Sequence, residues 1–248
     1  MDPIHQFEIT NYFVLGHLSG VDIAFTKSAL YMLISLGIIT LLMIGATSAR
    51  AMVPGRLQSV AEAFYEFVAS MLQNAAGPEA IRFFPLVFSL FMFVLTVNVL
   101  GLIPYTFAVT AQIIITVSLA LLVFATVIVY GVRKHGLHFF NLFVPAGAPV
   151  YILPLLVPIE VLSFFTRPVS HSIRLFANIL AGHITLKVFA GFVTTLGALG
   201  FLGWIGAILP LGLTVALTAL ELLVAFLQAY VFAILTCIYL NDAIHPGH

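Results

Sequence analysis

Seven charged, imidazole or amide side chains lie in one strongly apolar stretch of the chain, residues 149–191. They are Glu160, Arg167, His171, Arg174, Asn178, His183 and Lys187. An ionisable side chain at the centre of a bilayer costs about 2.5–3.5 kcal/mol on insertion scales, so such residues usually face a protein interior or a water-filled path. Their position therefore predicts a role in transport or in helix packing.

Arg174 is the strongest candidate for transport chemistry because its guanidinium stays protonated under ordinary conditions. It cannot carry a transported proton by titration, but its fixed charge repels hydronium and attracts a carboxylate. At about 4 Å and an effective dielectric constant of about 20, that attraction is about 4 kcal/mol. We expect Arg174 to hold a membrane carboxylate ionised and to block protons from passing it.

His183 and Glu221 can titrate in a useful range, with reference pKa values of about 6.5 and about 4.3, and could form a proton relay. Glu221 belongs to a second overlong apolar run, 205–240. The helical period aligns five polar side chains of this run within about 40° of the direction of the first. They are Thr214, Thr218, Glu221, Gln228 and Tyr239. The competing interpretation is a buried Glu–His pair, with Asn178 and Gln228 as hydrogen bonders between helices.

The composition is that of an integral membrane protein. Of 248 residues, 62% are hydrophobic and only 7% are charged, against about 25% in a soluble domain. Nine basic residues balance nine acidic ones, which gives no indication of nucleic-acid binding. Cys237 is the only cysteine and excludes an intramolecular disulfide. No cluster of ligand-type residues predicts a metal site.

Hydropathy and period predict an all-α fold with five membrane-crossing helices and one interfacial amphipathic helix in a single membrane domain, 1–248. The expected elements are an outer-face segment over 1–27 with little structure of its own, span one over 28–49, the amphipathic helix over 57–76, spans over 83–103 and 109–130, and long helices over 149–191 and 205–240. The last two crossings are expected to be tilted and to form a hairpin. Prolines inside 149–191 leave open that this stretch makes two spans.

Basic residues set the expected orientation. Arg50, Arg56 and Arg82 follow span one, Arg133 and Lys134 follow span three, and the opposite face has only Lys27. With five crossings, the positive-inside rule places the N-terminus outside and the C-terminus in the cytoplasm; two spans in 149–191 would reverse the C-terminus. Arg167 and Lys187 are expected to snorkel to the two interfaces.

The run RPVSHSIRLFANILAGH, residues 167–183, resembles the signature of subunit a of F-type ATP synthases, in its bacterial type. Arg174 matches the essential arginine of that family and Asn178 the asparagine that follows it. DPIHQFEI near the start, NVLGLIP after residue 97, Glu160, and ELLVAFLQAYVFAILTCIYL near the end also match, so nearly the whole chain is covered. The two C-terminal motifs together are highly specific.

The resemblance implies a proton-channel stator of the Fo motor, with two offset half-channels that reach the carboxylates of a c-subunit ring, so that proton flow drives rotation and ATP synthesis. Arg174 would face the ring and separate the channels. Asn178, His183, Glu221 and Gln228 would line the outer half-channel; Glu160, Ser163 and Ser170 would line the inner one; Tyr239 and His171 are accessory candidates. Which of His183 and Glu221 holds the proton stays open, as does H⁺ against Na⁺ coupling.

The implied partners are the c-subunit ring, the b-subunit of the peripheral stalk, the remaining synthase subunits, the lipid bilayer and protons, with no nucleic acid and no cofactor. The sequence has no GxxxxGK[ST] phosphate loop, so the subunit would not be catalytic on its own. The expected location is a bacterial inner membrane, with a mitochondrial inner membrane as the alternative.

Three other functions fit the sequence less well. A stand-alone ion-coupled secondary transporter would use Arg174 as a counterion, but such proteins usually show repeated halves, and the sequence has no convincing internal repeat. A helical scaffold would not need an arginine at mid-depth. An intramembrane hydrolase is disfavoured because no serine or cysteine stands in a recognisable nucleophile and base arrangement.

Overall fold

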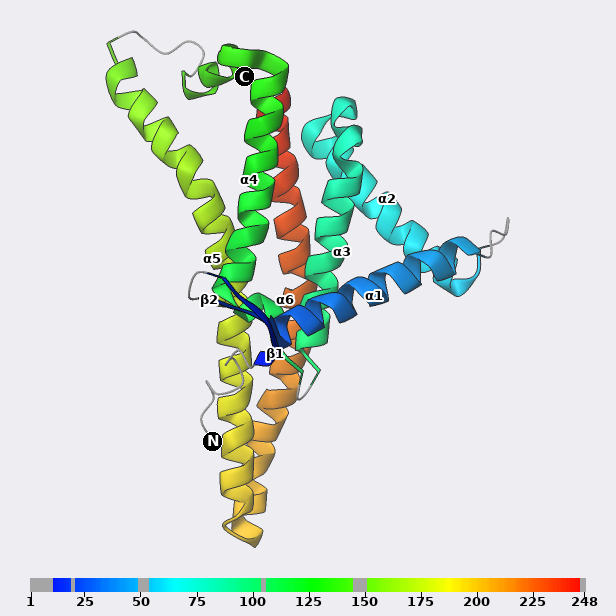
Figure 1. Ribbon diagram of the computed structural model, residues 1–248. Coiled ribbons are helices and arrows are strands. Elements are labelled where there is room, and N and C mark those ends of the chain that lie inside the picture. Colours follow the sequence, from blue (N-terminus) through cyan, green and yellow to red (C-terminus); the bar gives the residue numbers. More distant parts are fainter. Residues whose placement is uncertain (1–10, 19–20, 49–53, 104–105, 145–150, 246–248) are drawn as a thin grey trace. The chain divides into compact units, whose positions relative to one another are not determined.

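The computed structural model describes residues 11–18, 21–48, 54–103, 106–144 and 151–245 (Figure 1). Five of its helices are long and apolar enough to cross a membrane, which confirms the predicted all-α membrane fold with five crossings. The motif DPIHQFEI, Pro104 and the start of the stretch 149–191 lie outside the described residues.

The N-terminal segment forms a β-hairpin that the sequence interpretation missed. Strand β1 (Asn11–Leu18) pairs antiparallel with β2 (Val21–Thr26), with Asn11 opposite Thr26 and Leu18 opposite Val21. The expectation of little structure was wrong because it weighed the polar residues of this segment and overlooked its aromatic and β-branched ones, which favour strands.

Six α-helices and three 3₁₀ segments follow in the described residues. The α-helices are α1 (Lys27–Ser48), α2 (Arg56–Ala76), α3 (Phe84–Gly101), α4 (Ile113–His135), α5 (Leu153–Gly197) and α6 (Phe201–Ile244). The 3₁₀ segments are η2 (Pro78–Phe83), η3 (Val109–Ala111) and η4 (Gly136–Phe143). Helix α4 begins later than the predicted 109 because η3 comes first and Gln112 after it is extended. Helix α5 continues through Pro158 and Pro168, so this stretch is one helix and not two spans.

Helix α2 is amphipathic, as its period predicted. Val68, Met71, Leu72 and Ala76 are buried on one side, whereas Glu62 and Glu66 are exposed. The buried side packs on α3, where the ring of Phe91 lies 5.7 Å from that of Phe67. A helix at the membrane interface requires one apolar face and one polar face. In α2 the apolar face packs on α3, and the polar face is exposed.

The described chain divides into two compact units, each of which is treated separately below. The first comprises Met1–Leu41, Phe93–Gln112 and Leu175–Gln228. The second comprises Leu42–Met92, Ile113–Arg174 and Ala229–His248.

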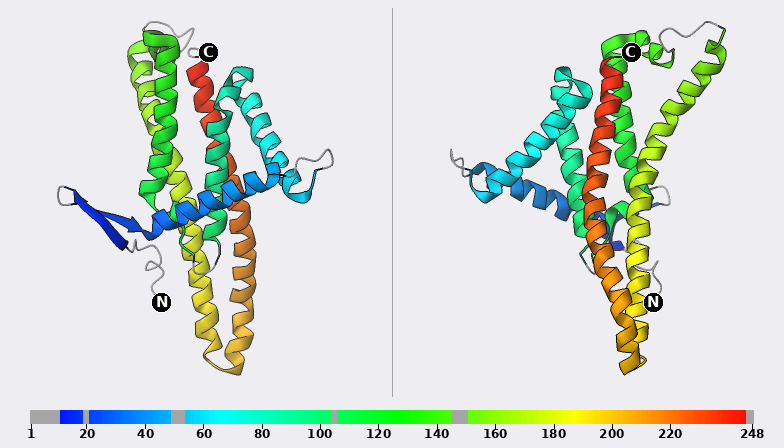
Figure 2. Two further views of the ribbon diagram at one scale, coloured as in Figure 1. Left: turned by 45° about the vertical axis from the view of Figure 1, so that its right-hand side comes forward. Right: turned by 180° about the vertical axis from the view of Figure 1, so that it is seen from behind.

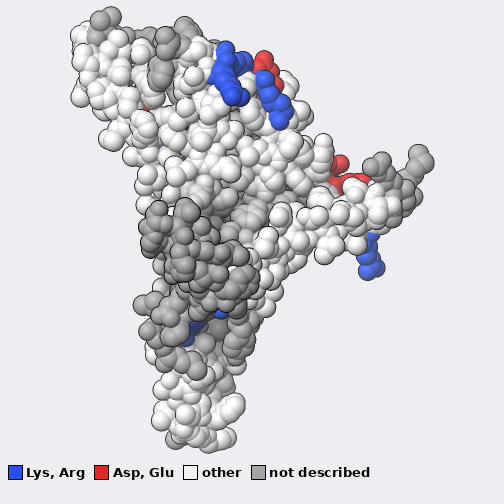
Figure 3. Space-filling view, viewed as in Figure 1, with Lys and Arg blue, Asp and Glu red and all other residues white. Residues whose placement is uncertain are grey.

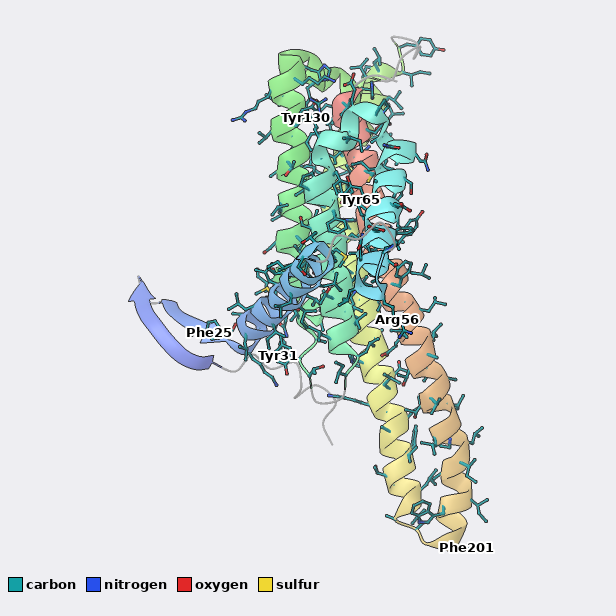
Figure 4. The ribbon with its side chains drawn as sticks, turned by 90° about the vertical axis from the view of Figure 1, so that its right-hand side faces the viewer. Phe25, Tyr31, Arg56, Tyr65, Tyr130 and Phe201 are labelled. Carbon is teal, nitrogen blue, oxygen red and sulfur yellow. The ribbon has the colours of Figure 1, made fainter. Side chains whose placement is uncertain are left out.

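The first unit contains the hairpin made by the second half of α5 and the first half of α6. Figure 1 and both views of Figure 2 show the two segments side by side up to their common turn, beside which Figure 4 labels Phe201. Gly200 makes this turn possible because its φ of +87° is rarely adopted by other residues. The chain has no Lys, Arg, Asp or Glu between Lys187 and Glu221, and the hairpin end accordingly appears uncharged in Figure 3.

A buried polar network joins three elements of the first unit. The hydroxyl of Thr110 donates to Oδ1 of Asn98 over 2.8 Å, and Nδ2 of Asn98 donates to the carbonyl oxygen of Ala225 over 3.4 Å. Asn98 and Thr110 are almost fully buried. Because an unpaired polar group is costly in such a place, the network fixes α3 and η3 against α6.

Replacing Thr110 by Val should lower the free energy of unfolding by about 1 kcal/mol, since Oδ1 of Asn98 then loses its donor. Thr40→Val is the matched control, because the exposed Thr40 hydroxyl bonds only to the carbonyl oxygen of Leu36 in its own helix. Denaturant unfolding in detergent micelles measures both variants. Equal stability of the two would contradict a structural role for the Asn98 network.

Candidate functional site

An amide pair connects α5 with α6 inside the first unit. Nδ2 of Asn178 donates to Oε1 of Gln228 over 2.8 Å. Gln228 is 5% exposed, whereas Asn178 is exposed on its outer side. The pair therefore has one end in the interior of the hairpin and one end that can exchange hydrogen bonds with water or with another chain.

The carboxyl group of Glu221 packs directly against the backbone of α5. A Cβ atom added to Gly182 would come within 2.5 Å of Oε1 of Glu221, so a larger residue there would force the Glu221 side chain to shift. Both carboxyl oxygens are buried and have no hydrogen-bond partner among the described residues. A buried carboxyl group in this state needs water, a proton or a group from outside the chain.

His183 follows Gly182 directly and brings an imidazole to the same level of the hairpin. The side chain is 8% exposed, and its Nε2 lies against the end of α3, 3.6 Å from where a Cβ on Gly101 would stand. Asn178, His183, Glu221 and Gln228 thus belong to one hairpin as the sequence predicted. A carboxyl group, an imidazole and two amides in one place can pass a proton through bound water.

Arg174 belongs to the second unit and is exposed on α5. It acts electrostatically on His171 and Tyr239, but it makes no ion pair with any residue that the structure describes. A guanidinium in a membrane-crossing helix is costly without a counter-charge. The guanidinium of Arg174 therefore needs a negative charge or water that comes from outside this chain.

Glu160, Ser163 and Ser170 precede Arg174 on the same helix. At 100° per residue the four side chains lie within about 80° of one another around α5. Ser163 and Ser170 are exposed and Glu160 is half-buried. They form a polar stripe that leads along this helix, within the second unit, to Arg174.

Arg167 pairs with a partner that the sequence interpretation missed. Nη1 of Arg167 and Oδ2 of Asp242 are 2.5 Å apart, and each side chain is 26% exposed. The guanidinium also lies 5.4 Å from the ring centre of Tyr239 and 5.5 Å from that of Phe164. The ion pair adds a partner to Arg167, while the expectation that this residue snorkels to an interface stays a prediction.

The accessory candidates His171 and Tyr239 pack together in the second unit. The His171 ring is 3% exposed, lies 3.9 Å from the ring centre of Phe232 and meets Tyr239 edge-on at 5.9 Å. These ring contacts hold α5 against α6, as does the Arg167–Asp242 ion pair. Their contacts suit helix packing and do not by themselves indicate proton transfer.

Three features of the site could not be read from residue types alone. Asn98 appeared in the sequence only as part of the NVLGLIP motif, Gly182 as one small residue among many, and Asp242 as part of a polar chain end. The structural role of each is evident only from its contact with a residue elsewhere in the sequence, namely Thr110, Glu221 and Arg167 respectively.

Comparison with known proteins gives concordant matches. The family model described as the ATP synthase A chain matches residues 29–241. A protein named ATP synthase subunit a from Rhodopseudomonas palustris (strain BisB5) is 69% identical over 247 residues, covering all of this chain and 99% of the relative. Proteins of the same name from Bradyrhizobium diazoefficiens and Afipia carboxidovorans are 66% and 64% identical, each covering all of this chain and 99% of the relative.

Gly182→Ala should displace the carboxyl group of Glu221, because the new methyl group overlaps it. We expect little change in the free energy of unfolding, because the flexible end of the Glu221 side chain can move, but a changed rate of carbodiimide modification at Glu221. Mass spectrometry of the modified peptide measures that rate. Gly191→Ala on the same helix is the control, since a Cβ there meets nothing within 4 Å. If both variants behave like the unaltered chain, the contact between Glu221 and Gly182 is wrong.

A double-mutant cycle tests the Arg167–Asp242 ion pair. Arg167→Gln and Asp242→Asn should each destabilise the chain by about 1–3 kcal/mol, and the double variant should lose less than the sum, because each single change strands a partly buried charge. Thermal unfolding in detergent provides the readout. The more exposed pair of Arg82 and Glu79 should show weaker coupling in the same cycle. Additive effects at Arg167 and Asp242 would exclude a direct interaction.

Proposed function

Because this chain belongs to the family of the ATP synthase A chain, subunit a, we propose that it is the proton-channel stator of the Fo motor of a bacterial ATP synthase. It is a multi-pass membrane subunit that gives protons access to the rotor, so that their flow drives rotation and ATP synthesis. Full-length relatives that share this name do not favour the stand-alone transporter.

The observation that carries the mechanism is the exposed guanidinium of Arg174, without a counter-charge among the described residues. The missing charge is a carboxylate of the c-subunit ring. As the rotor turns, each arriving carboxyl group meets the field of Arg174, which favours its ionised form by about 4 kcal/mol at about 4 Å and an effective dielectric constant of about 20. The same field repels a proton that would otherwise cross without turning the ring.

Entry of protons from the outer side uses the hairpin residues of the first unit. The buried carboxyl group of Glu221, the imidazole of His183, and the Asn178–Gln228 amide pair offer successive donors and acceptors. A proton that follows them reaches a ring carboxylate and neutralises it. The neutral group can then rotate into lipid, where a charge would be too costly.

Exit of protons to the inner side uses the stripe formed by Glu160, Ser163 and Ser170. Two exposed hydroxyl groups and one half-buried carboxyl group can hold a file of water beside α5. A charge that crosses the whole membrane gains about 2.3 kcal/mol per 100 mV. Offsetting the two half-channels around Arg174 converts this gain into rotation, while nucleotide chemistry takes place on other subunits.

The orientation follows from the basic residues and from contacts inside the second unit. Nζ of Lys134, at the end of α4, lies 3.3 Å from the carbonyl oxygen of Ile244 at the end of α6, so both helix ends share one side. The positive-inside rule assigns that side to the cytoplasm and the N-terminus to the outside. Assembly partners on this proposal are the c-subunit ring and the b-subunit, in the inner membrane.

Arg174→Ala should abolish ATP-driven acidification of inverted membrane vesicles and should raise the passive proton leak after the soluble ATPase head is stripped, by at least about tenfold. The leak rises because the electrostatic barrier between the half-channels is gone. Fluorescence quenching of a pH dye measures both quantities. Arg56→Ala, which removes an exposed arginine of α2, is the control. Near-normal pumping with an unchanged leak would overturn the role assigned to Arg174.

A further inference from the structure

A groove of about 430 Å³ runs along α4 in the second unit, and none of its lining residues belongs to the proposed proton path. Its lining residues are Leu122, Ala125, Thr126, Val129, Tyr130 and Arg133. Their spacing of three and four residues places them on one side of the helix. From Leu122 to Arg133 the helix rises about 16 Å, which is about half of the 30 Å hydrocarbon thickness. The groove is thus as long as one leaflet is deep.

One end of the groove is cationic and aromatic. Arg133 is exposed and makes no ion pair within the described chain. The guanidinium of Arg82, from η2, lies 4.9 Å from the ring centre of Tyr130, which Figure 4 labels on α4. The Tyr130 hydroxyl is buried and has no hydrogen-bond partner among the described residues. This end of the groove therefore carries the Arg133 guanidinium and the unsatisfied phenol of Tyr130, whose ring is covered by the guanidinium of Arg82.

The neighbouring charges leave this end positive. Glu79 accepts from Lys134 over 3.0 Å and lies 3.4 Å from Arg82, so one carboxylate is shared by two cations. Arg133 adds a third positive charge, and no described contact joins it to the Glu79 carboxylate. The other end, formed by Leu122, Ala125 and Val129, has no charge and is exposed.

We propose that this groove binds one anionic phospholipid. An acyl chain lies along Leu122, Ala125 and Val129, and the phosphate group is held by Arg82 and Arg133. Guanidinium groups match phosphate oxygens with paired hydrogen bonds, and basic pockets beside membrane helices select acidic headgroups. A neutral lipid would fill the apolar part equally well but would gain nothing from the two arginines.

The test uses the intact complex in phosphatidylcholine vesicles that contain phosphatidylglycerol with a photoactivatable diazirine in one acyl chain. Mass spectrometry should find the label on the α4 peptide that contains Leu122, Ala125 and Val129. Arg82→Gln with Arg133→Gln should reduce this label by about fivefold or more, since each basic residue near a membrane surface contributes about that factor. Ala125→Trp should abolish it by filling the groove. Arg56→Gln, another exposed arginine of the same unit, should leave it unchanged.

Competition in the unaltered complex needs no substitution, so it remains decisive even if a variant fails to assemble. Excess unlabelled phosphatidylglycerol should remove the label, whereas excess phosphatidylcholine should not. The proposal is overturned if a diazirine phosphatidylcholine labels α4 equally well, if both lipids compete alike, or if chemical crosslinking places another subunit's helix on Ala125. None of these outcomes depends on proton flux, so they are distinct from failure of the proposed motor function.

Discussion

Hydrocarbon offers no partner to a charge or to a hydrogen-bonding group, and this constraint decides where the polar side chains of the chain can lie. Most of them satisfy one another. Asn98 is held between Thr110 and the backbone of α6, Asn178 meets Gln228, and Arg167 meets Asp242. Others do not: among the described residues the carboxyl group of Glu221, Nε2 of His171 and the hydroxyl of Tyr130 have no hydrogen-bond partner, and the guanidinium of Arg174 has no ion pair. The satisfied groups hold helices together, and the unsatisfied ones are available to a proton or to another chain.

The same reasoning separates positioning residues from residues that act. Gly182 contributes no chemistry, but because it has no side chain the Glu221 carboxyl group can pack against α5 at this position. His183 is the next residue of the same helix. Asp242 likewise fixes the start of the Arg174 segment through Arg167, together with the packed rings of His171 and Phe232. On the proposed mechanism, a motor that works through one fixed charge depends on such supports, because a shift of a few ångströms changes a Coulomb interaction by kilocalories.

Much of this could be predicted from the sequence because the bilayer imposes long apolar runs, and a polar residue inside such a run stands out. That is why the positions of Arg174, His183, Glu221 and Gln228 alone made them candidates for the site. Contacts between distant positions could not be predicted this way: no period in the sequence links Arg167 with Asp242 or Gly182 with Glu221. The β-hairpin was missed for a different reason, since strand signals in Asn11–Thr26 are short and compete with a polar composition. Helix α4 begins at Ile113 and not at the predicted 109, because the 3₁₀ segment η3 comes first.

The uncharged turn between α5 and α6 also bears on how the chain enters the membrane. Only three residues, Ala198, Leu199 and Gly200, separate the two helices, and none carries a charge. Translocating such a short apolar loop meets little resistance, so both helices can insert together as one helical hairpin. The Asn178–Gln228 bond and the Gly182–Glu221 contact are nearly symmetrical about this turn and can close in succession from it. The polar side chains of the hairpin are then sheltered within a single chain during biogenesis, before assembly with other subunits.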